Sequence, residues 1–169
     1  MRIGIGYDSH PLVAGLPFVI GGVTIPFEKG LKGHSDADVL IHAVIDAILG
    51  AAGLGDIGTH FPDSDPAYKG IPGRELLKRT WSLIDGKKLR VGNIDAVVML
   101  EAPKLAPHLQ KIKENLAADL KTTPDRISVK AKTNEGMGMV GRGEGIAAQA
   151  VCLLESHASS SPHFELSNN

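Results

Sequence analysis

The sequence predicts an α/β fold of the α+β kind: a single domain with a mixed four-stranded sheet, helices on one face of that sheet and a small N-terminal hairpin. Three observations lead to this prediction. Apolar segments of strand length lie at both ends of the chain and in its second half, and apolar residues at helical spacing occur between them. No linker or internal repeat divides the 169 residues, a length that suits one domain. We therefore expect the domain to span residues 1–156 and residues 157–169 to form a disordered tail.

The strands are predicted from alternating or continuous apolar residues bounded by turn signals. The four strands of the sheet are expected at residues 1–8, 94–101, 126–132 and 146–155. The last of them is almost wholly apolar, which predicts that both of its faces are buried. The segment FVIGGVTIP at residues 18–26 predicts the hairpin, with its turn at Gly21–Gly22, and the segment FEKGLKGHSD that follows is expected to be a loop.

Three helices are predicted from apolar residues at helical spacing, over residues 36–52, 74–84 and 107–120. Ser35 is the expected N-cap of the first helix, with Asp38 as its capping-box partner, and Gly53 is expected to end that helix. Pro107 suits the first turn of the third helix, because that position needs no backbone N–H. The first helix is the most apolar of the three, and several candidate site residues lie on or beside it.

Composition and charge exclude several classes of protein. The net charge of −1 gives no basic excess for a nucleic-acid surface, so no nucleic-acid partner is expected. No apolar run reaches the ~18 residues of a membrane span, so no membrane partner is expected. The single cysteine, Cys152, cannot form an intrachain disulfide, and the first residues lack the pattern of a signal peptide. We expect a protein of the bacterial cytoplasm, or of the plastid stroma if the chain is a processed mature form.

Asp8, His10 and His42 are candidate metal ligands. Asp8 and His10 are two residues apart at the end of the first strand, so their side chains point to the same face. His42 lies on the first helix, with Asp38 and Asp46 one turn to either side, and one of these carboxylates is a candidate to hold the free ring nitrogen of a ligating histidine. An aspartate and two histidines suit Zn²⁺ and leave a fourth position for substrate or water. Spacing alone favours the ordinary alternative of a loop histidine and a half-buried helix histidine, but three ionisable groups on one stripe of so apolar a helix favour a metal site.

Two further segments are candidates for binding an anionic substrate. His34 and Ser35 lie at the predicted start of the first helix, where free N–H groups and the helix dipole favour phosphate. A loop that follows the same helix combines carboxylates with glycine and an aromatic residue, and its candidate residues are Asp56, Ile57, Gly58, Phe61, Asp63, Ser64 and Asp65. Its carboxylates suit sugar hydroxyls or a hard cation, and a loop of ordinary Asx turns is an equal alternative.

A last polar group follows the strand at residues 126–132 and suits a diphosphate with a divalent cation; it consists of Lys132, Thr133, Asn134 and Glu135. The segment GMGMVG that begins at Gly136 matches the dinucleotide fingerprint, but it leads into a strand and not a helix, which excludes a dinucleotide-binding fold. We expect its glycines to allow close approach of a ligand or a neighbouring subunit, with Arg142 as an anion clamp.

Four segments together resemble the 2-C-methyl-D-erythritol 2,4-cyclodiphosphate synthase family, in the order and at the spacing of that family. They are GIGYDSH at residues 4–10, the segment from IGGVTIPF to FPDSDP at residues 20–66, EAPKLAPH at residues 101–108 and KAKTNEGMGMVGRGEGIAAQAV at residues 130–151. The resemblance implies conversion of 4-diphosphocytidyl-2-C-methyl-D-erythritol 2-phosphate to the 2,4-cyclodiphosphate with release of CMP, in the non-mevalonate isoprenoid precursor pathway. It also implies a homotrimer with active sites between subunits and a central cavity with room for an isoprenoid diphosphate.

The same resemblance implies a role for each matching residue. Asp8, His10 and His42 correspond to the zinc ligands, and Glu135 to the ligand of Mg²⁺ or Mn²⁺ that bridges the diphosphate. His34 and Ser35 correspond to the phosphate contact at the helix start, and Asp56, Gly58 and Asp63 to the methylerythritol-binding loop. The residues that correspond to the cytidine pocket are Leu100, Glu101, Ala102, Pro103, Lys104, Leu105, Ala106, Ala131, Lys132 and Thr133.

Three positions depart from the family, although they keep hydrogen-bond donors and apolar bulk. Lys132 and Asn134 stand where many members carry threonine, and Met139 stands where some carry phenylalanine. Asn134 is expected beside the diphosphate, and Met139 and Arg142 beside the central cavity.

The implied reaction depends on positioning and charge neutralisation, because the attacking 2-phosphate oxygen is already ionised near neutral pH. His34 and Thr133 are the expected catalytic donors to the developing negative charge. Two alternatives stay open on the residues: a zinc-dependent phosphohydrolase of a nucleotide-diphosphate substrate, and a non-catalytic module that binds nucleotides or isoprenoid diphosphates.

Overall fold

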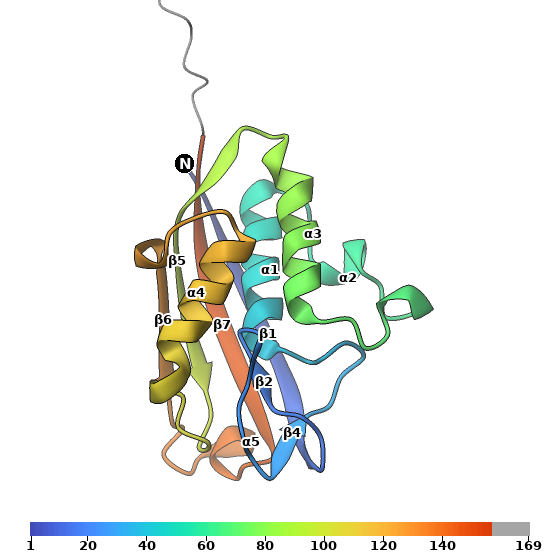
Figure 1. Cartoon of the computed structure of the whole chain (residues 1–169), viewed down its shortest axis with the longest axis vertical. Coiled ribbons are helices and arrows are strands. Elements are labelled where there is room, and N and C mark those ends of the chain that lie inside the picture. The colour runs from blue at the N-terminus through green and yellow to red at the C-terminus, as the bar shows by residue number, and fades with distance from the viewer. Residues whose placement is uncertain (157–169) are drawn as a thin grey trace, which may run out of the picture.

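The computed structural model of the chain describes residues 1–156, and the tail predicted at residues 157–169 lies outside the described residues. The strands are β1 (Arg2–Ala14), β2 (Val19–Ile20), β3 (Val23–Thr24), β4 (Lys29–Leu31), β5 (Leu89–Met99), β6 (Ile127–Lys132) and β7 (Gly145–Ser156). The helices are α1 (Val39–Ala52), α2 (Ile57–His60), α3 (Gly73–Asp85), α4 (Leu109–Asp119) and α5 (Gly138–Gly141), with short 3₁₀ turns η1 (Pro66–Tyr68), η2 (Ala106–His108) and η3 (Pro124–Arg126). Figure 1 shows a mixed α/β domain in which α1, α3 and α4 lie on one side of the sheet.

The main sheet has five strands, in the order β4-β1-β7-β5-β6, and the prediction of four strands is wrong. Only β5 and β6 are parallel, so the sheet is mixed. The missed strand, β4, is three residues long with Gly30 at its centre, which is too short for an apolar pattern to reveal. It forms because β1 continues to Ala14 and presents residues 12–14 as an edge for pairing. The strands β2 and β3 form a separate two-stranded ladder around Gly21–Gly22.

Helix α1 packs directly on strand β1 because two glycines remove the side chains between them. A Cβ atom at Gly4 would collide with the carbonyl oxygen of Ala47, and one at Gly6 with the carbonyl oxygen of Ala43. Only residues without a side chain permit this approach of helix backbone to strand backbone. As a consequence, the middle of β1, which carries Asp8, lies beside the helical turn that carries His42.

The start of helix α1 differs from the prediction. Its N-cap is Asp38, whose carboxylate accepts a hydrogen bond from the backbone N–H of Ile41, and the helix begins at Val39. Ser35 cannot cap the helix, because Ala37 adopts a left-handed conformation with φ of 57° and separates the two. The carboxylate of Asp38 also accepts hydrogen bonds from Gly21 and Gly22, so it joins the first helix to the β2–β3 turn.

We expect the Asp38→Ala variant to be destabilised by about 3 kcal/mol, because it leaves two buried backbone N–H groups and one part-buried N–H group without an acceptor. Urea unfolding followed by circular dichroism measures the free energy of unfolding. The Asp38→Asn variant is the matched control: its amide oxygen still accepts, so its loss should be smaller. An unfolding free energy of Asp38→Ala equal to that of the wild type would contradict this role.

The face of the sheet away from the helices is open in the single chain. Ile3, Ile5 and Tyr7 of β1 are 73%, 62% and 55% exposed, and Val151 of β7 is 42% exposed. The prediction that β7 is buried on both faces is therefore wrong for one chain: alternate residues such as Ala150 and Cys152 are buried under α1, and those between them face outward. Exposed apolar side chains in a contiguous row are typical of an interaction surface.

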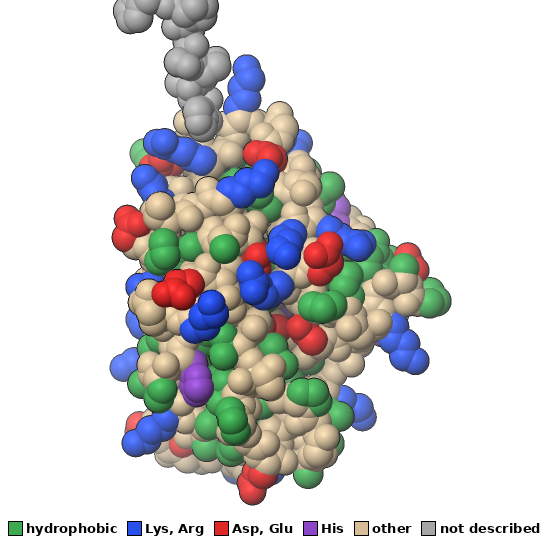
Figure 2. All heavy atoms as spheres, in the orientation of Figure 1, with side chains coloured by type: hydrophobic (Ala, Val, Ile, Leu, Met, Phe, Trp, Pro, Cys, Tyr) green, Lys and Arg blue, Asp and Glu red, His purple; other side chains and the backbone are tan. Residues whose placement is uncertain are grey.

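The helical side of the molecule carries charges of both signs. Figure 2 shows lysine and arginine side chains interspersed with aspartate and glutamate over this face, without a concentrated basic patch. Arg74 of α3 and Asp119 of α4 form a two-hydrogen-bond ion pair that joins these helices. Within residues 1–156, no helix has the length and apolar character needed to cross a bilayer.

Candidate metal centre and substrate-binding hollows

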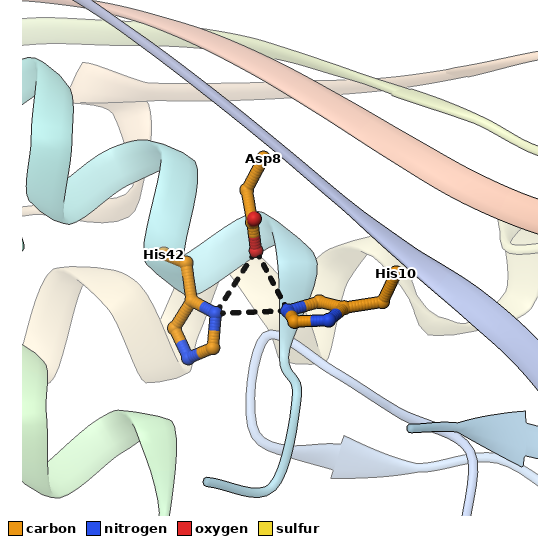
Figure 3. Close-up of side chains that lie close together, drawn as sticks. All are labelled: Asp8, His10 and His42. Carbon is orange, nitrogen blue, oxygen red and sulfur yellow. Dashed lines mark hydrogen bonds and ion pairs between the residues drawn. The ribbon is translucent and has the colours of Figure 1, made fainter. Parts of the chain in front are cut away.

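Asp8, His10 and His42 converge on one point, as the sequence predicted (Figure 3). The carboxylate oxygen Oδ2 of Asp8 lies 2.9 Å from Nε2 of His10 and 2.9 Å from Nδ1 of His42. The two ring nitrogens are 3.3 Å apart. Asp8 and His10 project from the same face of β1, and His42 reaches them from α1, so a strand and a helix supply the three groups together.

The electrostatics of this cluster favour a charged carboxylate beside the imidazoles. Burial alone would raise the pKa of Asp8, but hydrogen bonds from His10 and His42 outweigh it and lower the pKa to about 2. Burial alone would lower the pKa of His42, but its hydrogen bond to Asp8 and the charge of that carboxylate raise the pKa above its ordinary value. Two imidazole nitrogens and one carboxylate oxygen within 4.8 Å of one another match the ligand set of a catalytic metal site that keeps a position open.

The groups that hold the two histidines differ from those predicted. Nε2 of His42 lies 3.0 Å from the hydroxyl of Ser35, and Nδ1 of His10 lies 3.2 Å from the carbonyl oxygen of Lys32. The prediction that Asp38 or Asp46 holds His42 is wrong. Asp38 caps the helix, and the carboxylate of Asp46 accepts a hydrogen bond from the backbone N–H of Ile57.

A hollow of 420 Å³ opens beside the metal cluster. Besides His10 and His42, its lining includes six residues that the sequence nominated for substrate: His34, Ser35, Ile57, Gly58, Phe61 and Asp63. It also includes Pro62, Tyr68 and Leu76, which sequence reasoning missed. The ring of Tyr68 packs edge-on against that of Phe61, with 5.5 Å between the ring centroids. The two residues belong to separate turns, so no local sequence pattern predicts this contact.

Three residues of the predicted loop do not line this hollow. Asp56 caps α2 and accepts hydrogen bonds from the N–H and hydroxyl of Thr59, and Asp65 caps η1 and accepts from Ala67. Ser64 is absent from the lining as well. For Asp56 and Asp65, the carboxylates have the local role that the Asx-turn alternative describes.

A second hollow, of 190 Å³, lies where strands β5 and β6 end. Its lining contains nine of the predicted cytidine-pocket residues, namely Leu100, Glu101, Pro103, Lys104, Leu105, Ala106, Ala131, Lys132 and Thr133, while Ala102 is not part of it. In the sheet, His10 pairs with Ile146 of β7 and Met99 pairs with the next residue of β7, Ala147. The metal cluster and the second hollow therefore lie at the same end of the sheet.

The remaining nominated residues lie outside both hollows. Glu135 accepts a hydrogen bond from the hydroxyl of Thr133 at 2.7 Å and is not part of the cluster around Asp8. Asn134 donates its backbone N–H to Glu101. Met139 lines a further hollow of 220 Å³ together with His10, and Arg142 pairs with Glu144 at 2.9 Å.

Comparisons with known proteins agree with this arrangement. The model of the YgbB family matches residues 1–155. A 2-C-methyl-D-erythritol 2,4-cyclodiphosphate synthase of Chloroherpeton thalassium is 62% identical over 92% of this chain and 99% of its own. A solved structure of a protein of that name in a CDP-bound form is 38% identical, with a TM-score of 0.84 over 91% of this chain and 100% of its own. The bifunctional IspDF from Campylobacter jejuni is 42% identical, with a TM-score of 0.88 over 92% of this chain, which spans 42% of that longer protein. The chain therefore belongs to the YgbB family.

Proposed function

We propose that this chain cyclises 4-diphosphocytidyl-2-C-methyl-D-erythritol 2-phosphate to 2-C-methyl-D-erythritol 2,4-cyclodiphosphate and releases CMP, as an enzyme of the non-mevalonate route to isoprenoid precursors in the bacterial cytoplasm. The family match and the shared name of its relatives support this reaction. The observation that carries the proposal is the cluster of Asp8, His10 and His42, of which the two histidines line one hollow, with a second hollow at the same end of the sheet.

We assign Zn²⁺ to Asp8, His10 and His42, and a second cation, Mg²⁺ or Mn²⁺, to Glu135. The donor set of two imidazole nitrogens and one carboxylate oxygen fits zinc, and a carboxylate oxygen fits the harder cation. When bound, these cations neutralise the charge of the diphosphate and polarise its oxygens. Glu135 stands beside Thr133 at the edge of the second hollow, a position that suits the diphosphate of a nucleotide held there.

The chain's own residues position the reacting groups. An oxygen of the 2-phosphate attacks the β-phosphorus, the new bond closes the ring, and the bond from that phosphorus to CMP breaks. The attacking oxygen is ionised near neutral pH, so no general base is needed. The one cysteine cannot serve as a nucleophile, because burial raises the pKa of Cys152 to about 12. His34 and Ser35 hold the phosphate beside the metal cluster.

The second hollow holds the cytidine, and the residues at its edge act on the diphosphate. The hydroxyl of Thr133 donates to Glu135 in the free chain. We propose that it turns to the diphosphate once Glu135 binds its cation, and there stabilises the developing negative charge.

We assign the open face of the sheet to a homotrimer with active sites between neighbouring subunits. The exposed row of Ile3, Ile5, Tyr7 and Val151 supports this assembly, because association removes these apolar side chains from water. We place an isoprenoid diphosphate in a central cavity of that trimer, with Arg142 near its phosphates and Met139 beside the cavity.

Incubation of the purified protein with the proposed substrate, Zn²⁺ and Mg²⁺ tests the reaction. We expect release of one CMP and a product that contains no oxygen from ¹⁸O-labelled water, because the nucleophile is internal. Incorporation of ¹⁸O would show the zinc phosphohydrolase alternative, and absence of CMP release would show a binding module.

We expect the Glu135→Gln variant to keep its zinc and to need a higher Mg²⁺ concentration for half-maximal turnover, by roughly tenfold, because an amide replaces a carboxylate that neutralises the cation. A Mg²⁺ titration of CMP release measures the shift. The matched control is Glu114→Gln, which changes an exposed glutamate of α4 that lines neither hollow. An unchanged titration of Glu135→Gln would remove this residue from the cation site.

A further inference from the structure

We infer that Ser35 is a positioning residue that couples the metal centre to the substrate's phosphate. Its oxygen fixes His42 in the tautomer that a metal requires, and its hydroxyl hydrogen is thereby left to donate into the hollow. This inference rests on the proposed function for the identity of the phosphate, but not for the interaction between Ser35 and His42.

The tautomer of His42 follows from the positions of its two nitrogens. Nδ1 faces Asp8 and His10, at 2.9 and 3.3 Å, and is the nitrogen that offers its lone pair to a metal. A neutral imidazole carries one proton, so metal binding at Nδ1 places that proton on Nε2. Nε2 lies 3.0 Å from the hydroxyl oxygen of Ser35, which therefore accepts the hydrogen bond.

The hydroxyl of Ser35 has its accepting capacity filled by two donors. The backbone N–H of Ala37 donates to the same oxygen at 3.2 Å, so the N–H groups of Ala37 and His42 occupy both lone pairs. Within residues 1–156, these are the two hydrogen bonds of this side chain. Ser35 also lines the hollow beside the metal cluster, so its free O–H is available to an acceptor there. A phosphate oxygen is an acceptor of that kind.

The segment around Ser35 is held in place from both sides. The carboxylate of Asp36 accepts hydrogen bonds from the backbone N–H of Gly73, at 2.7 Å, and of Asp38, at 3.2 Å. Capping of helix α1 does not explain Ser35, because Asp38 performs that role. The polar contacts of Ser35 therefore point to His42 and to the hollow.

A metal and a phosphate should strengthen each other through this chain of hydrogen bonds. A metal at Nδ1 draws electron density from the ring and makes the Nε2 proton a better donor to Ser35. Because coupling between two ligands is reciprocal, a phosphate group in the hollow should tighten metal binding by the same factor as the metal tightens phosphate binding.

The Ser35→Ala variant tests the contact with the metal ligand. We expect its dissociation constant for Zn²⁺, measured by competition with a chromophoric chelator, to rise roughly 10-fold or more, as loss of an outer partner of a ligating histidine does. Ser35→Thr keeps the hydroxyl and should restore most of the affinity. The matched control is Ser82→Ala, which removes an exposed serine hydroxyl on α3 and should leave the Zn²⁺ affinity unchanged.

Binding of CDP, measured by calorimetry, tests the link to phosphate. In the wild type, we expect Zn²⁺ to tighten CDP binding, and in Ser35→Ala we expect this gain to shrink at least threefold even when zinc is saturating. If Ser35→Ala loses CDP affinity equally with and without Zn²⁺, Ser35 is only a phosphate contact and the coupling is wrong.

The position of the ring proton of His42 can be measured by NMR without a variant or a substrate. In zinc-loaded wild-type protein with ¹⁵N-labelled histidine, the protonated nitrogen of His42 should be Nε2, and its proton should exchange slowly with water. A proton found on Nδ1, or a Zn²⁺ dissociation constant of Ser35→Ala within twofold of the wild type, would overturn the inference. Both results are independent of CMP release, so failure of the proposed reaction and failure of this inference can be told apart.

Discussion

The His42→Ala variant is expected to lose its metal and to turn over the substrate at least ~10³-fold more slowly, while it keeps its fold. In the proposed zinc site, His42 supplies one of the three ligands found within residues 1–156, and Nδ1 of its ring lies 2.9 Å from Oδ2 of Asp8. Charge stabilisation by a bound metal ion contributes several kcal/mol to the transition state, and each 1.4 kcal/mol is a factor of ten in rate. The fold should survive, because the body of helix α1 is held by its apolar contacts with β1 and β7 and by the Asp38 cap.

Metal content by mass spectrometry and CMP release, measured on the same preparation, check this result. The matched control is His108→Ala, which removes a histidine of η2 outside the cluster and should keep full metal content. Full zinc with normal turnover in His42→Ala would falsify the metal assignment. Loss of turnover with full zinc would instead give His42 a role other than metal binding.

Short-range rules place each member of the metal cluster on its own strand or helix, but spacing alone favours two unrelated histidines. The ionisable groups on one stripe of the first helix and the family resemblance are what predict a metal site. Asp8 and His10 share a face of β1 through the two-residue period of a strand, and His42 lies on a helix whose apolar pattern is plain. The close packing of this strand against the helix is harder to predict from the sequence. Gly4 and Gly6 allow the close approach, and an isolated glycine in a strand does not state which backbone will lie against it.

The partners of His42 could not be predicted, because helical spacing gives proximity but not hydrogen bonding. Asp38 and Asp46 stand one turn from His42, yet the backbone N–H groups of Gly21, Gly22 and Ile57 occupy their carboxylates. Ser35 takes their place because Ala37, in the left-handed conformation, turns the chain away from the helix. A left-handed alanine is uncommon, and nothing in the sequence marks this one.

The fifth strand and the open face of the sheet also could not be predicted, because both depend on contacts between separate segments or between chains. Strand β4 forms because it pairs with residues 12–14 of β1. Its three residues are too few to show an apolar pattern of their own. The apolar composition of β7 predicts burial on both faces, but in a single chain alternate residues along much of the strand are buried only on the side under α1. An apolar residue can be buried against another subunit as well as within its own chain. The exposed apolar residues of β7 are therefore a reason to expect that this face binds another subunit.

The Ile5→Asp variant is therefore expected to elute as a folded monomer without CMP release, whereas we expect the wild type, as the proposed trimer, to elute at three times the 17.8 kDa of one chain. Ile5 pairs with Val151 across β1 and β7, and both side chains point to the open face with Ile3 and Tyr7. In the proposed trimer, a carboxylate buried in an apolar interface without a partner would cost several kcal/mol in each of three equivalent contacts, which is enough to dissociate the assembly.

Light scattering coupled to size exclusion measures the mass, and circular dichroism checks the fold. Leu83→Asp is the matched control: it places the same charge at an exposed leucine of α3, 43% exposed on the helical side, and should leave a trimer with normal activity. If the active site lies between subunits, dissociation and loss of turnover must occur together as protein concentration falls. A monomeric Ile5→Asp that still releases CMP would place the whole site within one chain, and the nucleotide would then have to bridge β7 from the second hollow to Asp8, His10 and His42 in the same subunit.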